Sequence, residues 1–451
     1  MARVQSGTPC ATIARMTTQP HTKIPTPNGN LALKALQTIL RTRSPLPALE
    51  VFHGALGKVF RANLPSFKPI MTAGAEWARW LLVEARESFL WKAPKDPIAR
   101  LLRDGLLVAD GEMHDSMRRL MNPALHRNAL VGYVESMWRA TDRIAEQWQP
   151  HETYDMLPEV RKIALLIVME TLFSVDFMPH ITNYWAALLH TLRYISPGIW
   201  VLWADVPRPN YRRALRHIDN YLHQIIRLRR AHLTQTGAQP NDLLGILVSA
   251  EGVDDAMIRD QMLTMIIAGH DTSTGLLAWA MYMIGADAQA AQRLYDEVDS
   301  VLGDAPPSME HLAQLKYLDR FIDETLRLYP PAHLGSRIAA QDLTHEGYLI
   351  RKGERVTYSI YVTHRMADYW QNPGDFYPDR FLEKPVPYSF LPFGGGARNC
   401  IGAAFAQVEA KVILARLVQR YRFTLLQPHV HMHMAVTLEP RPGVIMRAVR
   451  R

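Results

Sequence analysis

The sequence contains little cysteine and no long hydrophobic run. Its two cysteines, Cys10 and Cys400, lie at opposite ends of the 451 residues, which excludes a disulfide framework. The longest apolar run covers residues 163–169, whereas a transmembrane helix needs roughly 18 residues. The first 30 residues also lack the apolar segment of a secretory signal. We therefore expect a flexible leader over residues 1–30, one domain over residues 31–451, no transmembrane segment and a cytoplasmic location.

The net charge is +8, but the sequence contains no dense basic run and no basic–aromatic repeat. This argues against a nucleic-acid partner. A dispersed basic surface suits an acidic protein partner or membrane headgroups instead. The hydrophobic content of 48% is enough for a large buried core.

Helical periodicity dominates the chain up to residue 329. Apolar residues recur at three and four positions in segments 128–148 and 160–175, and a long helix is predicted over residues 254–284. Another helical segment ends at Pro330, and strand-like segments appear only after it. The fold class is therefore predicted as mostly α with small β-sheets, in one large domain.

A loop predicted over residues 196–209 carries Trp200, Val201, Leu202 and Trp203. Large apolar residues in a loop suggest a lid, an entry route or a peripheral membrane contact. The alternative is that they pack on the core.

The centre of the long helix is polar within an apolar segment. It reads Gly269, His270, Asp271, Thr272 and Ser273. Burying an acid there costs several kcal/mol unless it is paired or hydrated. The segment is either a kinked helix with a local polar patch, or an acid–alcohol pair that delivers protons beside a ligand.

Two further groups of polar residues are candidates for a structural or metal-binding role. Glu324 and Arg327 are three residues apart on one helix, and Arg380 could share the same carboxylate in a buried clamp. His429, His431 and His433 would lie on one face of a strand, either as metal ligands or as a solvated edge.

The segment LPFGGGARNCIG, residues 391–402, precedes an amphipathic helix. A thiol there is expected to have a lowered pKa, because the helix dipole and the loop amides favour an anion. The segment lacks the GK[ST] of a phosphate-binding loop. A nucleophilic Cys400 would need a His base that the sequence does not place.

Together these motifs resemble the cytochrome P450 family. FGGGARNCIG matches the cysteine loop F-x-x-G-x-R-x-C-x-G, AGHDTS resembles A-G-x-D/E-T-T/S, ETLR is its E-x-x-R, and PDRF resembles P-E-R-F with Asp379 in place of Glu. The four occur in family order, and the resemblance covers about residues 50–451.

The resemblance implies haem b bound between the long central helix and the helix after the cysteine loop, with the Cys400 thiolate on iron. Phe393 would pack near the sulfur, Gly396 would let the loop pass near the porphyrin, and Gly402 would let the following helix approach it. Arg398, Arg337, His114 and Arg118 would hold the propionates. Glu324, Arg327 and Arg380 become a structural clamp.

The resemblance further implies that Asp271 and Thr272 organise protons for O2 activation. The residues expected around a lipophilic substrate (fatty acid, carotenoid, terpenoid or steroid-like) are Met265, Ala268, Ala332, Leu334 and Val436. The implied function is a monooxygenase, with an H2O2-using peroxygenase or a non-catalytic haem-based gas binder as alternatives.

The electron donor would be a separate ferredoxin, flavodoxin or flavoprotein, and the chain is expected to be a monomer. Basic residues near the cysteine side could contribute to the donor's site: Arg119, Arg127, Lys411 and Arg416.

Overall fold

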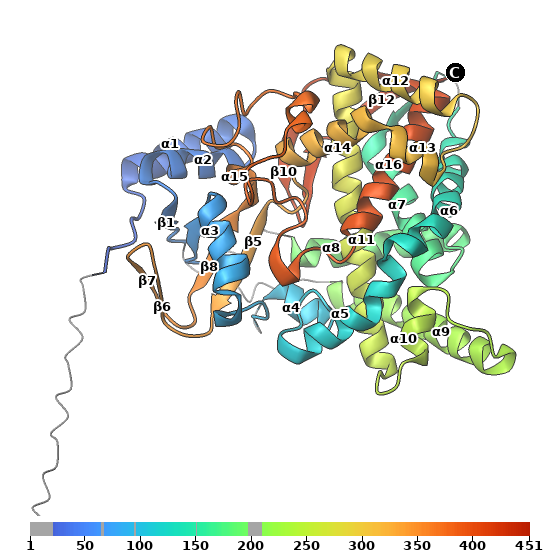
Figure 1. Ribbon diagram of the computed structural model, residues 1–451, viewed down its shortest axis with the longest axis horizontal. Helices are drawn as coiled ribbons and strands as arrows, with labels where there is room; N and C mark the ends of the chain where they lie inside the picture. Colours follow the sequence, from blue (N-terminus) through green and yellow to red (C-terminus); the bar gives the residue numbers. More distant parts are fainter. Residues whose placement is uncertain (1–20, 65–66, 94–95, 150, 197–209) are drawn as a thin grey trace, which may run out of the picture.

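A computed structural model describes residues 21–64, 67–93, 96–149, 151–196 and 210–451. Helices make up most of these residues, and the largest sheet lies on one side of the molecule (Figure 1). The prediction of a mostly α fold in one domain is therefore confirmed.

The longest helix of the described chain, α11, spans Asp255–Ala286 and matches the prediction within two residues. Asp254 caps it by accepting a hydrogen bond from the Met257 N–H at 2.8 Å. It packs against α7 (Met156–Phe173), α14 (Lys316–Leu328) and α16 (Ala403–Arg420). Nearly all of it is buried, so it forms the axis of the helical half.

The remaining helices pack around this axis. Those before α11 are α5 (Gly111–Leu125), α6 (Arg127–Ala145), α8 (Ile181–Ile195), α9 (Tyr211–Thr236) and α10 (Leu243–Ser249). Those after it are α12 (Ala288–Leu302) and α13 (Met309–Gln314), and α4 (Pro97–Leu102) lies earlier in the chain. The predicted segments 128–148 and 160–175 correspond to α6 and α7. The Trp200–Trp203 segment lies outside the described residues.

The largest sheet has the strand order β1-β2-β8-β5-β3. Its strands are β1 (Val59–Arg61), β2 (Ile70–Thr72), β8 (Arg355–Ser359), β5 (Leu334–Ala339) and β3 (Phe89–Leu90). Only the β2–β8 pair is parallel among these strands. Three of the five strands precede residue 100, so the expectation that strands occur only late in the chain is wrong. Periodicity cannot detect strands of two or three residues.

Three smaller sheets complete the described β structure. They pair β4 (Thr153–Asp155), β12 (Ile445–Arg450) and β9 (Tyr421–Leu425), then β10 (His431–Met434) with β11 (Leu438–Arg441), and β6 (Leu343–His345) with β7 (Tyr348–Ile350). The chain directly after β8 forms the short helix α15 (Ile360–Thr363). The Ser359 hydroxyl caps it by accepting from the Val362 N–H.

The domain begins earlier than residue 31. The Thr22 N–H donates to the Gly347 carbonyl at 2.9 Å, and the Arg61 N–H donates to the Pro25 carbonyl at 2.8 Å. Ile24 is 7% exposed. Residues 21–30 therefore belong to the packed domain, so the predicted leader of residues 1–30 is too long. The composition of this segment, rich in Thr and Pro, concealed its pairing with the sheet.

The helices α1 (Gly29–Thr42) and α2 (Leu46–Leu56) lie at the sheet end of the molecule, remote from α9 and α10 (Figure 1). Among the described residues, no helix combines the length and apolarity needed to cross a membrane.

A fully buried carboxylate joins α14 to the segment that carries η5 (Pro378–Leu382). Glu324 accepts from Arg327 at 2.7 and 2.8 Å and from the Arg380 Nε at 2.9 Å. Arg327 also donates to the carbonyls of His364, Pro373 and Asp375. The structure thus brings the three predicted residues together, and the surplus guanidinium donors fix the loop after α15.

We predict that Glu324→Gln lowers the free energy of unfolding by about 3–5 kcal/mol, because it leaves buried guanidinium charge without its partner. Denaturant unfolding followed by far-UV circular dichroism measures this. Glu135→Gln, which removes an exposed partner of Arg139 on α6, is the matched control and should leave the midpoint unchanged. Equal midpoints for both variants would contradict the clamp.

Candidate functional site

Cys400 lies between the single turn η6 (Gly396–Arg398) and the start of α16. Its N–H donates to the Phe393 carbonyl at 2.8 Å, which closes the loop. Gly396 has φ +66°, and a Cβ there would lie 2.2 Å from the Leu82 carbonyl of η1 (Trp80–Glu84). Gly396 is thus required by contact with backbone, whereas the sequence analysis assigned it to approach of a ligand.

The Cys400 side chain is solvent-accessible by area, yet protein surrounds the sulfur. The accessible surface therefore faces a space inside the fold. Burial raises the pKa of the Cys400 thiol, and this outweighs the lowering by the Gly402 N–H and by Arg118. The expected lowered pKa is wrong for the polypeptide alone. A cation bound beside the sulfur would lower this pKa.

The burial of α11 is interrupted near its centre by one small and one polar residue. Ala268 and Thr272 are half-buried, while Ile267, His270 and Asp271 around them are buried. They are four residues apart and so share one face of the helix. The Thr272 hydroxyl donates to the Ala268 carbonyl at 2.6 Å. Gly269 faces α7 instead, where a Cβ would lie 3.0 Å from the Val168 side chain.

Asp271 points into a buried cluster with α7 and β11. Its Oδ1 lies 3.2 Å from the Arg161 Nη2, and its Oδ2 accepts from the Thr437 hydroxyl at 3.0 Å. Arg161 also contacts Glu439. Burial raises the pKa of Asp271, although Arg161 and Thr437 oppose the shift. One guanidinium cannot balance two buried carboxylates, which favours a proton on Asp271.

Two more titratable groups are buried next to this cluster. Glu409 on α16 accepts from the Ser273 hydroxyl, and burial raises the pKa of Glu409 to about 8 despite that hydrogen bond. Burial lowers the pKa of His270 to about 4, and its Nδ1 contacts the Ile266 carbonyl. At neutral pH both side chains are therefore uncharged. The sequence analysis missed Arg161, Glu439 and Glu409, because nothing local links them to α11.

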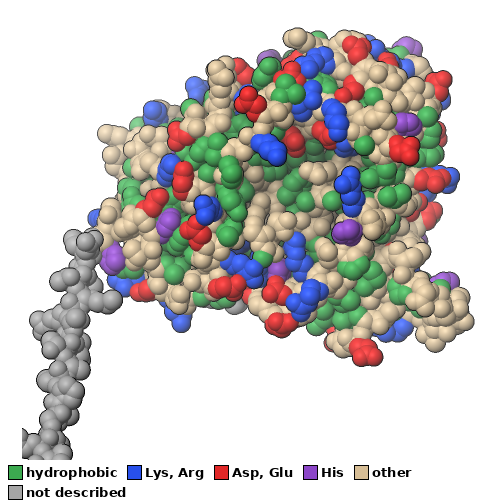
Figure 2. Space-filling view, in the orientation of Figure 1, with side chains coloured by type: hydrophobic (Ala, Val, Ile, Leu, Met, Phe, Trp, Pro, Cys, Tyr) green, Lys and Arg blue, Asp and Glu red, His purple; other side chains and the backbone are tan. Residues whose placement is uncertain are grey.

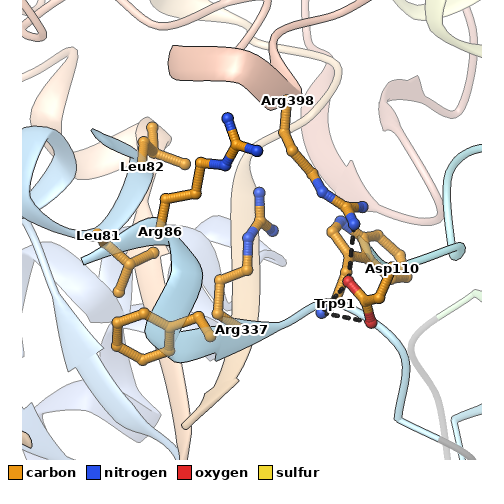
Figure 3. Close-up of a pocket in the computed structure, with 8 residues that line it drawn as sticks. Leu81, Leu82, Arg86, Trp91, Asp110, Arg337 and Arg398 are labelled. Atoms are coloured by element: carbon orange, nitrogen blue, oxygen red, sulfur yellow. Dashed lines mark hydrogen bonds and ion pairs between the residues drawn. The ribbon is translucent and has the colours of Figure 1, made fainter. Parts of the chain in front are cut away.

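Three arginines converge on one small pocket (Figure 3). Arg86 from η2 (Arg86–Ser88), Arg337 from β5 and Arg398 from η6 point their guanidinium groups into the same space. Among the described residues that line it, Asp110 is the one carboxylate, 2.7 Å from Arg398. Burial lowers the pKa of Arg398, with Arg337 and Arg86 contributing.

Asp110 is itself held by the N–H groups of Trp91 and Lys92. Arg337 donates to the Ser336 carbonyl at 2.8 Å. We call Arg86, Arg337 and Arg398 the arginine cradle. Arg86 also pairs with Glu87 at 2.8 Å, so Arg337 is the one cradle arginine without an ion pair among the described residues. The planar guanidinium donors suit bidentate binding of carboxylates. Arg337 and Arg398 were predicted here, whereas Arg86 follows no motif and was missed.

His114 and Arg118 do not line the cradle. Arg118 donates to the backbone carbonyl and to the side-chain oxygen of Asn399, both at 2.8 Å. The buried His114 contacts Asp115 through Nδ1 at 2.8 Å, and burial lowers its pKa. Arg118 therefore supports the cysteine loop from α5, whereas the contact of His114 lies within α5.

The predicted apolar residues come from three parts of the fold. Met265 is buried on α11, Leu334 is half-buried at the start of β5, and Val436 is half-buried between β10 and β11. Ala332 is exposed and Ala268 half-buried. Phe393 packs against the main core, and a Cβ on Gly402 would lie 3.9 Å from the Cys400 sulfur.

The expectation that four basic residues are available to a partner is corrected for two of them. Lys411 is buried and bonds Asp319 and the Leu312 carbonyl, and Arg416 is held by Asp142, so neither offers a free charge to a partner. Arg119 and Arg127 are exposed. His431 and His433 lie half-buried on β10, and the described residues contain no group of three or more His, Cys, Asp or Glu side chains placed to hold a metal ion.

We predict that Glu409 makes stability depend on pH. The unfolded carboxyl loses its proton above about pH 4.5, while the native one keeps it to about pH 8. Native protein therefore binds more protons in this window, and its free energy of unfolding should fall by about 1.4 kcal/mol per pH unit. Urea unfolding at several pH values measures this.

Glu409→Gln should remove that slope, while Glu135→Gln on the surface should retain it. Parallel pH profiles for the protein and Glu409→Gln would show that Glu409 titrates normally.

The comparisons with known proteins agree with this arrangement. A model of the cytochrome P450 family matches residues 25–446. Cytochrome P450 139 of Mycobacterium tuberculosis is 33% identical over 421 residues, covering 88% of this chain and 96% of that protein. Cyclooctatin synthase of Streptomyces melanosporofaciens is 30% identical over 450 residues, covering 95% and 94%.

Protein LUTEIN DEFICIENT 5, a chloroplastic protein of Arabidopsis thaliana, is 28% identical over 470 residues, covering 96% of this chain and 78% of that protein. The family match covers nearly the whole described domain and includes the cysteine loop, the centre of α11 and the clamp. The chain therefore belongs to the cytochrome P450 family and is a haem-dependent monooxygenase.

Proposed function

We propose that this chain binds haem b between α11 and the cysteine loop and oxidises a lipophilic substrate with O2. The observation that carries this proposal is the pairing of an enclosed thiol at Cys400 with the arginine cradle. A porphyrin presents a metal cation and two carboxylates, which these two groups match. When bound, haem with a thiolate ligand supplies O2 activation.

The residues of the chain would have separate tasks. Cys400 would hold the iron, Arg86, Arg337 and Arg398 would bind the propionates, and Phe393 would pack near the sulfur. Thr272 is half-buried on the open face of α11, where its hydroxyl can hold a water. Asp271, which directly precedes Thr272, would relay a proton to that water. Arg161, Thr437 and Glu439 would set how firmly Asp271 keeps its proton.

The substrate is proposed to be lipophilic: a fatty acid, carotenoid, terpenoid or steroid-like molecule. The side chains that support this are apolar, namely Met265, Ala268, Ala332, Leu334 and Val436. A relative from Streptomyces melanosporofaciens, 30% identical over 347 residues, is named cyclooctat-9-en-7-ol 5-monooxygenase. Its name describes oxidation of a hydrocarbon-rich alcohol, which supports the same class here.

The electron donor is proposed to be a separate ferredoxin, flavodoxin or flavoprotein, acting on a monomer. On the face where α16 lies, Lys and Arg side chains are interspersed with acids (Figure 2). Arg119 and Arg127 are exposed and could meet an acidic donor. Asp271 and Thr272 favour this reaction over a peroxygenase, which would not need proton delivery to O2.

The ligand assignment has a spectroscopic test. We expect the reduced carbon monoxide complex of the haem-loaded protein to show the red-shifted Soret band of thiolate ligation. Cys400→Ser and Cys400→His should lose that band, while Cys10→Ser should keep it. A band unchanged in the Cys400 variants would overturn the proposed function.

The arginine cradle predicts how firmly haem is held. Arg337→Met should release haem about 10 to 100 times faster, because a charge-assisted hydrogen bond contributes about 1.5–3 kcal/mol. Arg86→Met should act in the same direction. Transfer of haem to an acceptor apoprotein measures the rate.

Arg351→Met is the matched control, since Arg351 is exposed and pairs with Asp342 at the surface. Equal rates for Arg337→Met and Arg351→Met would exclude the cradle from haem binding.

A further inference from the structure

Helix α1 turns a row of leucines away from the protein. Leu33, Leu36 and Leu40 are 56%, 50% and 71% exposed. Spacings of three and four residues place them on one face of the helix. The opposite face carries Ala35, which is 2% exposed and packs toward α2. A surface helix normally buries its apolar face. The exposed leucine row lies on the other face and needs another explanation.

Basic residues border the leucine row. Lys34 and Arg41 are seven residues apart on α1, which places both along the same edge of the row. Arg43 follows the helix at φ +54°. Within the described part of the chain, none of these three side chains forms an ion pair with a carboxylate. Their charge is therefore available to an outside partner.

The sequence around α1 is strongly biased toward positive charge. No Asp or Glu occurs before Glu50, whereas Arg3, Arg15, Lys23, Lys34, Arg41 and Arg43 precede it. These six charges account for most of the net +8. An acid-free basic segment with an apolar stripe is typical of a helix that lies in the surface of an anionic membrane.

We propose that α1 docks on an anionic phospholipid surface, with Leu33, Leu36 and Leu40 entering the headgroup region and Lys34 and Arg41 on lipid phosphates. The helix lies at one end of the molecule, where no other helix or strand of the described residues lies outside it (Figure 1). The Trp200–Trp203 segment is not needed for this contact. The inference does not depend on the proposed function.

A second copy of the chain fits this surface less well. In a symmetric dimer the same face meets itself, so the leucine rows of two copies would bring both pairs of Lys34 and Arg41 together. The described segment 21–49 offers no acid to offset that repulsion. An anionic lipid surface supplies both the apolar region and the negative charge.

The test is sedimentation of the full haem-loaded chain with vesicles. We expect binding to a one-to-one mixture of phosphatidylcholine and phosphatidylglycerol, weakened by salt, and little binding to phosphatidylcholine alone. The triple variant Leu33→Ser, Leu36→Ser, Leu40→Ser should lower the partition coefficient about tenfold or more, because it removes the inserted apolar area. Lys34→Glu with Arg41→Glu should weaken binding to the mixed vesicles.

The matched control is Leu228→Ser with Leu382→Ser, which replaces leucines of comparable exposure (63% and 69%) on other elements. It should bind as the unaltered chain does, and far-UV circular dichroism should show that all variants are folded. Full binding by the triple variant would overturn the proposal. So would a dimer in solution that the triple variant converts to monomer, since the leucines would then bind a second copy.

Discussion

The buried polar centre of α11 is the constraint on which the rest of the structure depends. An acid in the middle of a 32-residue helix cannot be reached by bulk water, so other elements must supply its partners. Arg161 from α7 and Thr437 beside β11 do so for Asp271. The protonation of Asp271 is thereby linked to the packing of α7 on α11, and to the packing of the β10–β11 hairpin on both helices.

The buried acids of the core differ in how many cations face each of them. Glu324 has two arginines, Asp271 and Glu439 share one, and Glu409 has only the Ser273 hydroxyl. The first arrangement holds two segments together. The other two leave a carboxylic acid with a raised pKa beside the proposed catalytic space. A buried carboxyl group thus holds two segments together in one place, and in another it has a raised pKa because it lacks enough cationic partners.

The cationic groups divide in a similar way. In the arginine cradle, Arg398 pairs with Asp110 and Arg86 with Glu87, whereas Arg337 has no ion pair among the described residues. Lys34 and Arg41 on α1 also lack acidic partners in the described chain. Unbalanced charge at these two places supports ligands of opposite charge, carboxylates at the first and lipid phosphates at the second.

The sequence by itself determined the residues whose role is local. The cysteine loop, the polar centre of α11 and the Glu324–Arg327 pair each lie within one short segment, and helical periodicity located α11 within two residues. Their order along the chain was enough to indicate the family.

Only the tertiary structure decided which distant residues join them. Arg86, Arg161, Glu409 and Glu439 reach the site from other helices and strands, and no local pattern encodes such contacts. The direction of the Cys400 pKa shift was also decided there, because burial depends on what surrounds the sulfur and outweighs the nearby amide. Exposure of the α1 leucines follows the same reasoning: periodicity shows that a helix has an apolar face, but packing determines which faces are covered.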